Sequence, residues 1–189
     1  MILTVTTLYS DYPAAFWICL GMTIVLAGAG VALATAARKK GVFATYDAIV
    51  AAALWCYAVV VLYFTVIGRY SKAEYRYELT PFRSLRKLLT ECGAAELKNL
   101  LINFAMLMPV AFLLCELRRK KDRPAVVAIV GSLGFSVVIE ALQFVSRTGT
   151  FEIDDLIFNF AGAFVSTVIW CIFNNARVKR ITKDATKRL

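Results

Sequence analysis

The chain of 189 residues contains no histidine, and charged residues make up only 19% of it. Histidine is the commonest general base and a common zinc ligand, so histidine-based lipid phosphatases and Ser–His hydrolases are excluded. The sequence also has no GxSxG, GxGD or CxxC stretch. Four of its five cysteines lie within apolar runs, where we expect small packing residues rather than disulfides. These are Cys19, Cys56, Cys115 and Cys171.

Hydrophobic residues, in contrast, reach 60%, and the mean hydropathy is +0.67. They cluster into five runs, each approaching the roughly 20 residues that cross about 30 Å of hydrocarbon. The sequence therefore predicts an all-α fold: a single membrane domain, residues 1–189, built as a polytopic bundle of about five transmembrane helices. The predicted spans are Pro13–Ala37, Asp47–Gly68, Asn99–Leu117, Pro124–Val145 and Leu156–Phe173.

The net charge of +9 is typical of either nucleic-acid binding or membrane flanks. Most basic residues sit at the ends of the apolar runs, so we expect a membrane protein without a nucleic-acid partner. Fourteen Lys and Arg residues fall on one side of the predicted topology and eight on the other. Because the more basic side is usually cytoplasmic, the N-terminus is predicted outside and the C-terminus in the cytoplasm.

One predicted external loop is long, from Arg69 to Lys98, and contains the stretch TPFRSLRKLLT. Its leucines recur at helical spacing between basic residues, which predicts a short helix. Thr80 is the expected N-cap and Pro81 the expected first helical residue. Such a helix either lies in the outer membrane interface or packs on the top of the bundle, and the sequence leaves both open.

Polar residues recur along one face of several spans. In the fourth span, steps of 4, 4, 3 and 4 residues place one set on a single helix face: Ser132, Ser136, Glu140, Gln143 and Arg147. In the fifth span, Asp155, Asn159 and Gly162 share a face, below Glu152 and Asp154. The third span contributes Asn103, and Arg69 follows the second.

With the predicted topology, these groups fall at one depth and form a polar pocket open to the outside. A carboxylate inside a membrane is costly unless it is paired, so we expect Glu140 near an arginine, Arg69 first and Arg147 second. Arg83 is a further counter-charge. Two plainer interpretations remain: Glu140 belongs to a structural ion pair, and the acids of FEIDD cap a helix N-terminus.

The same residues resemble the VanZ-like family of membrane proteins. LTPF is similar to the family's NLxPF, and NFAMLMPVAFLL (Asn103–Leu114) to its NxxxFxPxGFLL. IEALQ, the following Arg147 and FEIDDLIFNFAG resemble xExxQ…R…FDxDDxxxNxxG. Ala111 and Glu78 depart from the family's Gly and Asn. The resemblance covers about residues 69–173 and implies a small bacterial cell-envelope protein; the name-giving member is associated with low-level teicoplanin resistance.

We therefore expect a site that binds membrane lipids or lipid-linked cell-wall molecules, in a multi-pass protein of the bacterial cell membrane. The candidate binding residues are Arg69, Arg83, Asn103, Glu140, Gln143, Arg147, Asp154, Asp155 and Asn159. The alternative is an intramembrane enzyme with Glu140 as its general base. A structural partner, or a homo-oligomer through the Gly- and Ala-rich first span, is a third interpretation. No cofactor or metal is predicted, although Glu152, Asp154 and Asp155 would suit a hard cation.

Overall fold

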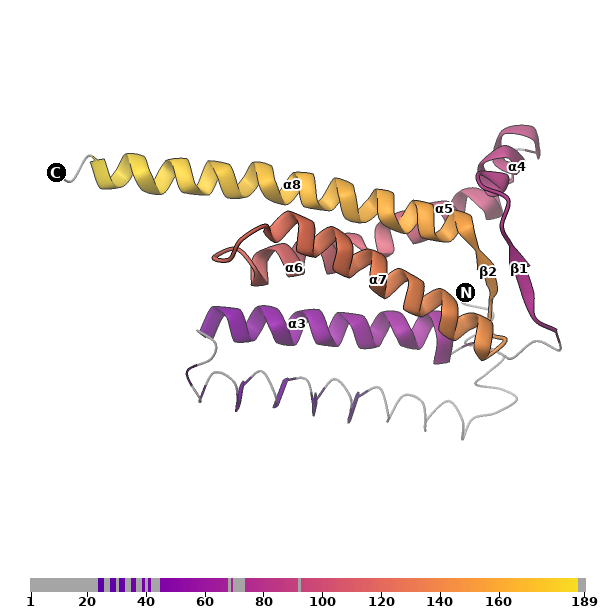
Figure 1. Cartoon of the computed structure of the whole chain (residues 1–189), viewed down its shortest axis with the longest axis horizontal. Helices are drawn as coiled ribbons and strands as arrows, with labels where there is room; N and C mark the ends of the chain where they lie inside the picture. Colours follow the sequence, from indigo (N-terminus) through magenta and orange to yellow (C-terminus); the bar gives the residue numbers. More distant parts are fainter. Residues whose placement is uncertain are drawn as a thin grey trace.

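A computed structural model describes residues 24–25, 28–29, 31–32, 35–36, 39, 41, 45–67, 69, 74–91 and 93–186. Within this part of the chain, long helices lie side by side (Figure 1). Four of them are long and apolar enough to cross a membrane: Thr45–Ile67, Ala94–Leu117, Pro124–Val145 and Ile153–Asp184. The all-α bundle is therefore confirmed, with four of the predicted spans. The predicted span Pro13–Ala37 lies largely outside the described residues.

The first of these spans is α3 (Thr45–Leu62), which continues into a π-helical segment, η1 (Tyr63–Ile67). The next is α5 (Ala94–Met106) followed directly by α6 (Met108–Leu117). The third is α7 (Pro124–Val145), which runs back toward the end where α5 begins (Figure 1). The last, α8 (Ile153–Thr186), packs along α5, α6 and α7.

The apolar core is small. Leu107, Val110, Ala111 and Ala163 are buried where α6 meets α8. Many large apolar side chains instead stay exposed on the outer faces of the helices, among them Ile49, Val130, Val138, Val145 and Ile172. Such a surface is unfavourable in water and normal in lipid, so the burial pattern agrees with a membrane protein.

The break between α5 and α6 is explained by Pro109, which has no backbone N–H to donate. The carbonyl groups on either side of the break receive side-chain donors. The Tyr57 hydroxyl donates to the Met106 carbonyl at 2.9 Å, and the Ser166 hydroxyl donates to the Met108 carbonyl at 2.6 Å. Because unsatisfied backbone groups cost several kcal/mol in lipid, these two bonds make an interrupted helix tolerable there.

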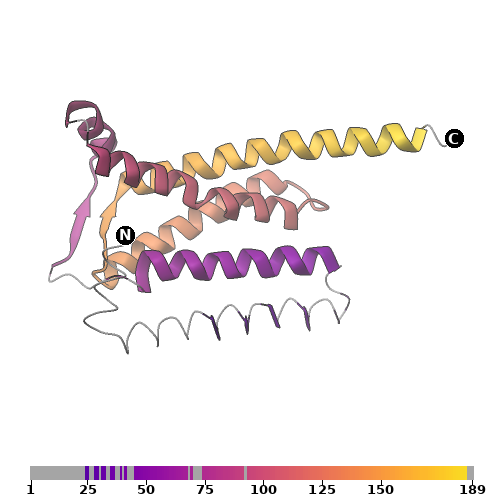
Figure 2. The ribbon, with the colours of Figure 1, turned by 180° about the vertical axis from the view of Figure 1, so that it is seen from behind.

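Two short strands join the loops at one end of the bundle. β1 (Arg76–Glu78) pairs in parallel with β2 (Thr150–Glu152), with Glu78 opposite Glu152. These strands were not predicted from the sequence, because three-residue segments show no periodicity. Beside them lies α4 (Arg83–Glu91), the helix predicted in the long loop. Both views show β1, β2 and α4 at the same end of the bundle (Figures 1 and 2).

Helix α8 is longer than predicted. It begins at Ile153 rather than Leu156 and continues to Thr186 rather than Phe173. Its 34 residues span about 51 Å, whereas the hydrocarbon layer needs about 30 Å. The polar last turns therefore extend past the other helices at the end opposite α4 (Figure 2).

Candidate functional site

The polar side of α7 that the sequence predicts is buried against neighbouring elements. Ser132, Ser136, Gln143 and Glu140 are all buried, with only 2% of Glu140 exposed. On α8, Asp154 and Asn159 are buried as well. Most of these residues lie in the half of the bundle that carries the strands and α4, which is also where α5 and α8 begin and α7 ends (Figure 1).

Glu140 and Gln143 connect α7 to two other elements. The Glu140 carboxylate accepts a hydrogen bond from the backbone N–H of Glu152 in β2, at 3.2 Å. The Gln143 amide donates to the Thr65 carbonyl in η1, at 3.0 Å. A π-helical turn leaves backbone groups that a regular helix would satisfy internally, and Gln143 supplies the donor for one of them.

Two amides fix α8 against its neighbours. The Asn159 side-chain N–H donates to the Ser136 hydroxyl on α7 at 2.8 Å, and the Asn103 side chain on α5 donates to the Asp155 carboxylate. The Asn159 amide oxygen and the Ser132 hydroxyl are buried and have no hydrogen-bond partner among the described residues. Polar interior groups of this kind commonly hold a buried water molecule.

The arginines are placed differently from one another. Arg147, in a left-handed conformation with φ 58°, donates to the Tyr75 hydroxyl at 3.2 Å and stacks over its ring at 4.4 Å. Arg69 interacts electrostatically with Glu140 and Asp155. Among the described residues, however, no basic group lies within 4.0 Å of the Glu140 carboxylate, so Glu140 forms no direct ion pair with them.

Asp154 links α8 to the start of α4. Its two carboxylate oxygens accept the backbone N–H groups of Phe82, at 2.5 Å, and Ser84, at 2.7 Å. Phe82 has a φ of 59°, which brings these two N–H groups toward one acceptor. The prediction of Thr80 as the N-cap is therefore wrong: α4 begins at Arg83, and an acid 70 residues away caps it.

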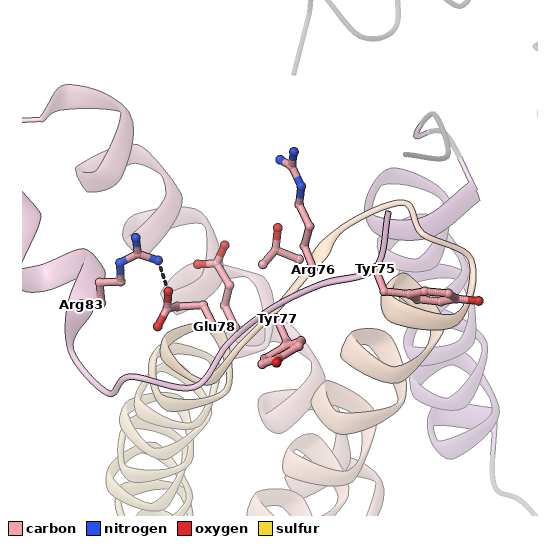
Figure 3. A pocket seen from close by; sticks show the side chains of 7 residues that line it. Tyr75, Arg76, Tyr77, Glu78 and Arg83 are labelled. Carbon is pink, nitrogen blue, oxygen red and sulfur yellow. Dashed lines mark hydrogen bonds and ion pairs between the residues drawn. The ribbon is translucent and has the colours of Figure 1, made fainter. Parts of the chain in front are cut away.

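Thr80 contacts Glu78 instead. Its backbone N–H donates to the Glu78 carboxylate at 3.1 Å. The side-chain and backbone hydrogen bonds from Thr80 hold the pKa of the Glu78 carboxyl below its ordinary value. Glu78 also forms an ion pair with Arg83, the first residue of α4 (Figure 3).

Glu78 and Arg83 line an open cleft of about 430 Å³, within the range of roughly 300–1,000 Å³ usual for small-ligand sites. Arginine, glutamate, tyrosine and threonine make up its walls: Tyr75, Arg76, Tyr77, Glu78, Arg83, Thr150 and Glu152. Through the Glu152 backbone, the cleft is joined to the buried carboxylate of Glu140. Of the predicted binding residues, Arg83 therefore lines the cleft, and Glu140 lies beneath it.

The carboxylates do not assemble into a metal site. Asp154 faces α4 and Asp155 faces Asn103. In the part of the chain that the structure describes, no group of three or more Cys, Asp or Glu residues could hold a metal ion.

A second charged cluster, around Glu116 at the other end of the bundle, was not predicted. The Glu116 carboxylate is buried and accepts hydrogen bonds from the Trp170 indole at 2.7 Å, Tyr46 at 2.9 Å and Arg177 at 3.0 Å. Arg119 pairs with Asp47 at 2.5 Å and stacks over the Tyr46 ring. An acid in the last turn of an apolar span was the signal available in the sequence, but the basic run after it suggested only a membrane flank.

The model of the VanZ/LLP1 family matches residues 49–174, about two thirds of the chain. The chain belongs to the VanZ/LLP1 family. No curated protein and no solved structure matches it. The matched range contains α5 to α7, both strands and most of α3 and α8. It therefore includes all of the predicted binding residues, from Arg69 to Asn159. Together with its apolar helices, the family match makes the chain a VanZ-like multi-pass membrane protein.

Proposed function

We propose that this VanZ-like protein binds the polar head of an envelope lipid, or of a lipid-tailed glycopeptide, at the end of the bundle that carries α4. One observation carries the proposal. Two acids of α7 and α8, the buried Glu140 and the half-buried Asp155, interact electrostatically with Arg69 and lie beside a cleft lined by Arg76 and Arg83. Intramembrane ionisable groups of this kind usually mark a functional site.

The position of the cleft suits a lipid head group. Its walls come from the loops just beyond the spans that end at Ile67 and Val145. Tyr75, Tyr77 and Phe82 are more than half exposed there, and amphipathic aromatic rings favour the membrane–water boundary. A lipid held by its tails in the bilayer would present its head group at this level. We further propose that this end faces the outside of a bacterial cell membrane.

The chemical roles follow from which groups are already engaged. Asn103, Gln143 and Asn159 donate to internal partners, so they fix the helices around the site. The guanidinium groups of Arg76 and Arg83 line the open cleft, where forked donors suit phosphate or carboxylate oxygens. Arg83 pairs with Glu78 through one terminal nitrogen, so its other N–H donors are left for a ligand. The arginines would therefore contact the ligand, and the amides would hold the walls in place.

A second candidate function is an intramembrane enzyme that modifies a lipid-linked substrate, with Glu140 as general base. The observation that favours it is the state of Glu140. This carboxylate is buried, accepts one backbone hydrogen bond and has no ion pair within 4.0 Å among the described residues. A base of this kind keeps its capacity to take a proton.

The substitution Glu140→Gln separates the two functions, because it keeps the shape of the side chain and removes the base. If the site binds only, short-chain envelope lipids should bind the purified variant roughly 10–100-fold more weakly than the wild type. If Glu140 is a general base, lipid turnover should fall by roughly 10²–10⁴-fold while binding persists. Binding to the full chain is measured beside product analysis of envelope lipids from cells that express each variant.

Glu96→Gln is the matched control, because Glu96 lies in the first turn of α5 and does not line the cleft. It should leave binding and lipid composition at wild-type levels. If a folded Glu140→Gln protein binds lipid normally and envelope lipids stay unchanged, Glu140 is structural and the enzyme function fails. The binding function fails if the wild-type protein binds none of the envelope lipids.

A further inference from the structure

We propose that the cleft selects a head group that carries both a phosphate ester and a primary ammonium, the chemistry of phosphoethanolamine. The inference rests on the proposed lipid-binding function and names the class of lipid. It starts from the strand pair. In the parallel register, Glu78 lies opposite Glu152 and Arg76 opposite Thr150. Paired residues and residues two apart in a strand project from the same face of a sheet.

One face of this small sheet therefore carries both signs of charge. Figure 3 shows Arg76 and Glu78 on one side of β1 and the Tyr77 ring on the other. Glu152 and Thr150 belong to the same face through their register, and Arg83 joins it from α4. Among the described residues that line the cleft, two guanidinium groups and two carboxylates are present, so their formal charges balance. A purely anionic head group would gain from the arginines and be opposed by the two carboxylates.

The distribution of the charges fits a ligand with separated opposite charges. The Arg83 guanidinium is already paired with Glu78, whereas Arg76 forms no ion pair with any described residue. If the phosphate of the head group binds Arg76, its ammonium, two carbons further along, lies near the Glu78 and Glu152 carboxylates. Both contacts would be charge-assisted hydrogen bonds, which are about twice as strong as neutral ones.

A primary ammonium fits better than a quaternary one. Carboxylates bind a primary ammonium through N–H donors, and a choline head group has none. Choline is instead recognised by open aromatic faces. Of the two tyrosines at the cleft, Tyr75 already carries the Arg147 guanidinium at 4.4 Å over its face, and the Tyr77 ring lies on the opposite side of β1 from Arg76 and Glu78 (Figure 3). The chemistry of the walls therefore favours an N–H donor.

The test measures binding of short-chain phosphatidylethanolamine, phosphatidylcholine and phosphatidylglycerol to the purified full chain in detergent. Phosphatidylcholine has the same net charge without N–H donors, and phosphatidylglycerol has no ammonium. We expect phosphatidylethanolamine to bind about tenfold more tightly than either of the others, the value of one charge-assisted hydrogen bond. Free phosphoethanolamine should compete for the site more weakly than the intact lipid does. If the two compete equally well, the natural ligand need not be a lipid, and that part of the proposal is overturned.

Two variants assign the contacts. Glu152→Gln should remove the preference for phosphatidylethanolamine over phosphatidylcholine, and Glu78→Gln serves the same purpose if Glu152→Gln fails to fold. Arg76→Gln should weaken the binding of all three lipids about equally, because it removes the contact with the phosphate. Arg86→Gln, an exposed guanidinium of α4 that does not line the cleft, is the control and should change nothing.

The outcomes separate this inference from the proposed function. If none of the three lipids binds, the lipid-binding function fails and the inference fails with it. If phosphatidylglycerol or phosphatidylcholine binds as tightly as phosphatidylethanolamine, and Arg76→Gln still weakens binding, the lipid-binding function stands. Selection for an ammonium group is then overturned.

Discussion

Gly162 on α8 shows how one residue sets the spacing of the helices. A Cβ atom built at this position would lie 1.7 Å from the Phe104 carbonyl oxygen of α5. The obstacle is backbone, which cannot rotate away as a side chain could. Gly162→Ala should therefore force α5 and α8 apart and lower the free energy of unfolding by about 2–3 kcal/mol. The measurement is the unfolding midpoint of the purified full chain in detergent.

Gly134→Ala is the matched control, because a Cβ atom at Gly134 meets nothing within 4 Å. Alanine favours a helix over glycine by about 1 kcal/mol, so this variant should be as stable as the wild type or more stable. Equal midpoints for the two variants would contradict a steric role for Gly162.

At this scale the sequence predicted some residues and missed others for a physical reason. Helical spacing was enough to place Glu140 and Gln143 on one buried face of α7, because that pattern is local to one element. Gly162 was indicated by helical spacing and by the family motif, but its steric role was missed because it depends on Phe104, 58 positions earlier. Glu116 was missed because its three donors come from α3 and α8, which no local pattern relates to α6.

Among the elements, α4 depends on a single acid of another helix. Asp154 accepts the two N–H groups at the start of α4, and capping bonds of this kind contribute about 0.5–2 kcal/mol. Asp154→Ala should release the first turn of α4 from α8 while the spans stay folded. We expect amide hydrogen exchange of Phe82 and Ser84 to rise by roughly 2–30-fold, measured by mass spectrometry on the full chain.

Asp184→Ala is the control, because Asp184 is an exposed acid near the far end of α8. Its removal should leave exchange in α4 unchanged. If exchange at Phe82 and Ser84 is the same in Asp154→Ala as in the wild type, Asp154 does not hold α4.

The helix boundaries differ from the predicted ones where a helix continues beyond its apolar residues. Hydropathy marks the hydrocarbon layer, so it placed the end of the last span at Phe173. The backbone stays helical to Thr186, because polar residues such as Lys183 are also good helix formers. The strands were missed for the opposite reason: β1 and β2 form only because α7 and α8 bring their loops together.

The whole molecule is polarised along its helices. One end carries the cleft, both strands and α4, and the other carries the Glu116 cluster and the loop between α6 and α7 (Figure 1). Each end uses buried acids, but their partners differ. Glu116 is bonded to three donors and holds α3, α6 and α8 together, whereas Glu140 accepts one backbone donor beneath an open cleft. The Glu140 end therefore retains more capacity for a ligand.

The orientation of this polarised bundle is the last prediction. Because α5 and α6 form one span, a position after Glu91 and a position after Lys121 lie on opposite sides of the membrane. The loop Arg118–Arg123 holds five basic residues, and the positive-inside rule counts these regardless of the acids that pair with them. A reporter that fluoresces only in the cytoplasm, inserted into the full chain, should therefore give signal after Lys121 and none after Glu91.

Replacing Lys120, Lys121 and Arg123 with Gln is the informative perturbation. These three residues lie in the loop between α6 and α7 and form no ion pair with any described residue, so their loss should spare the Glu116 cluster. If the loop charges set the orientation, part of the signal should move from the Lys121 insertion to the Glu91 insertion. Signal after Glu91 and none after Lys121 in the unchanged chain would invert the topology. The cleft would then face the cytoplasm, where an external glycopeptide could not reach it.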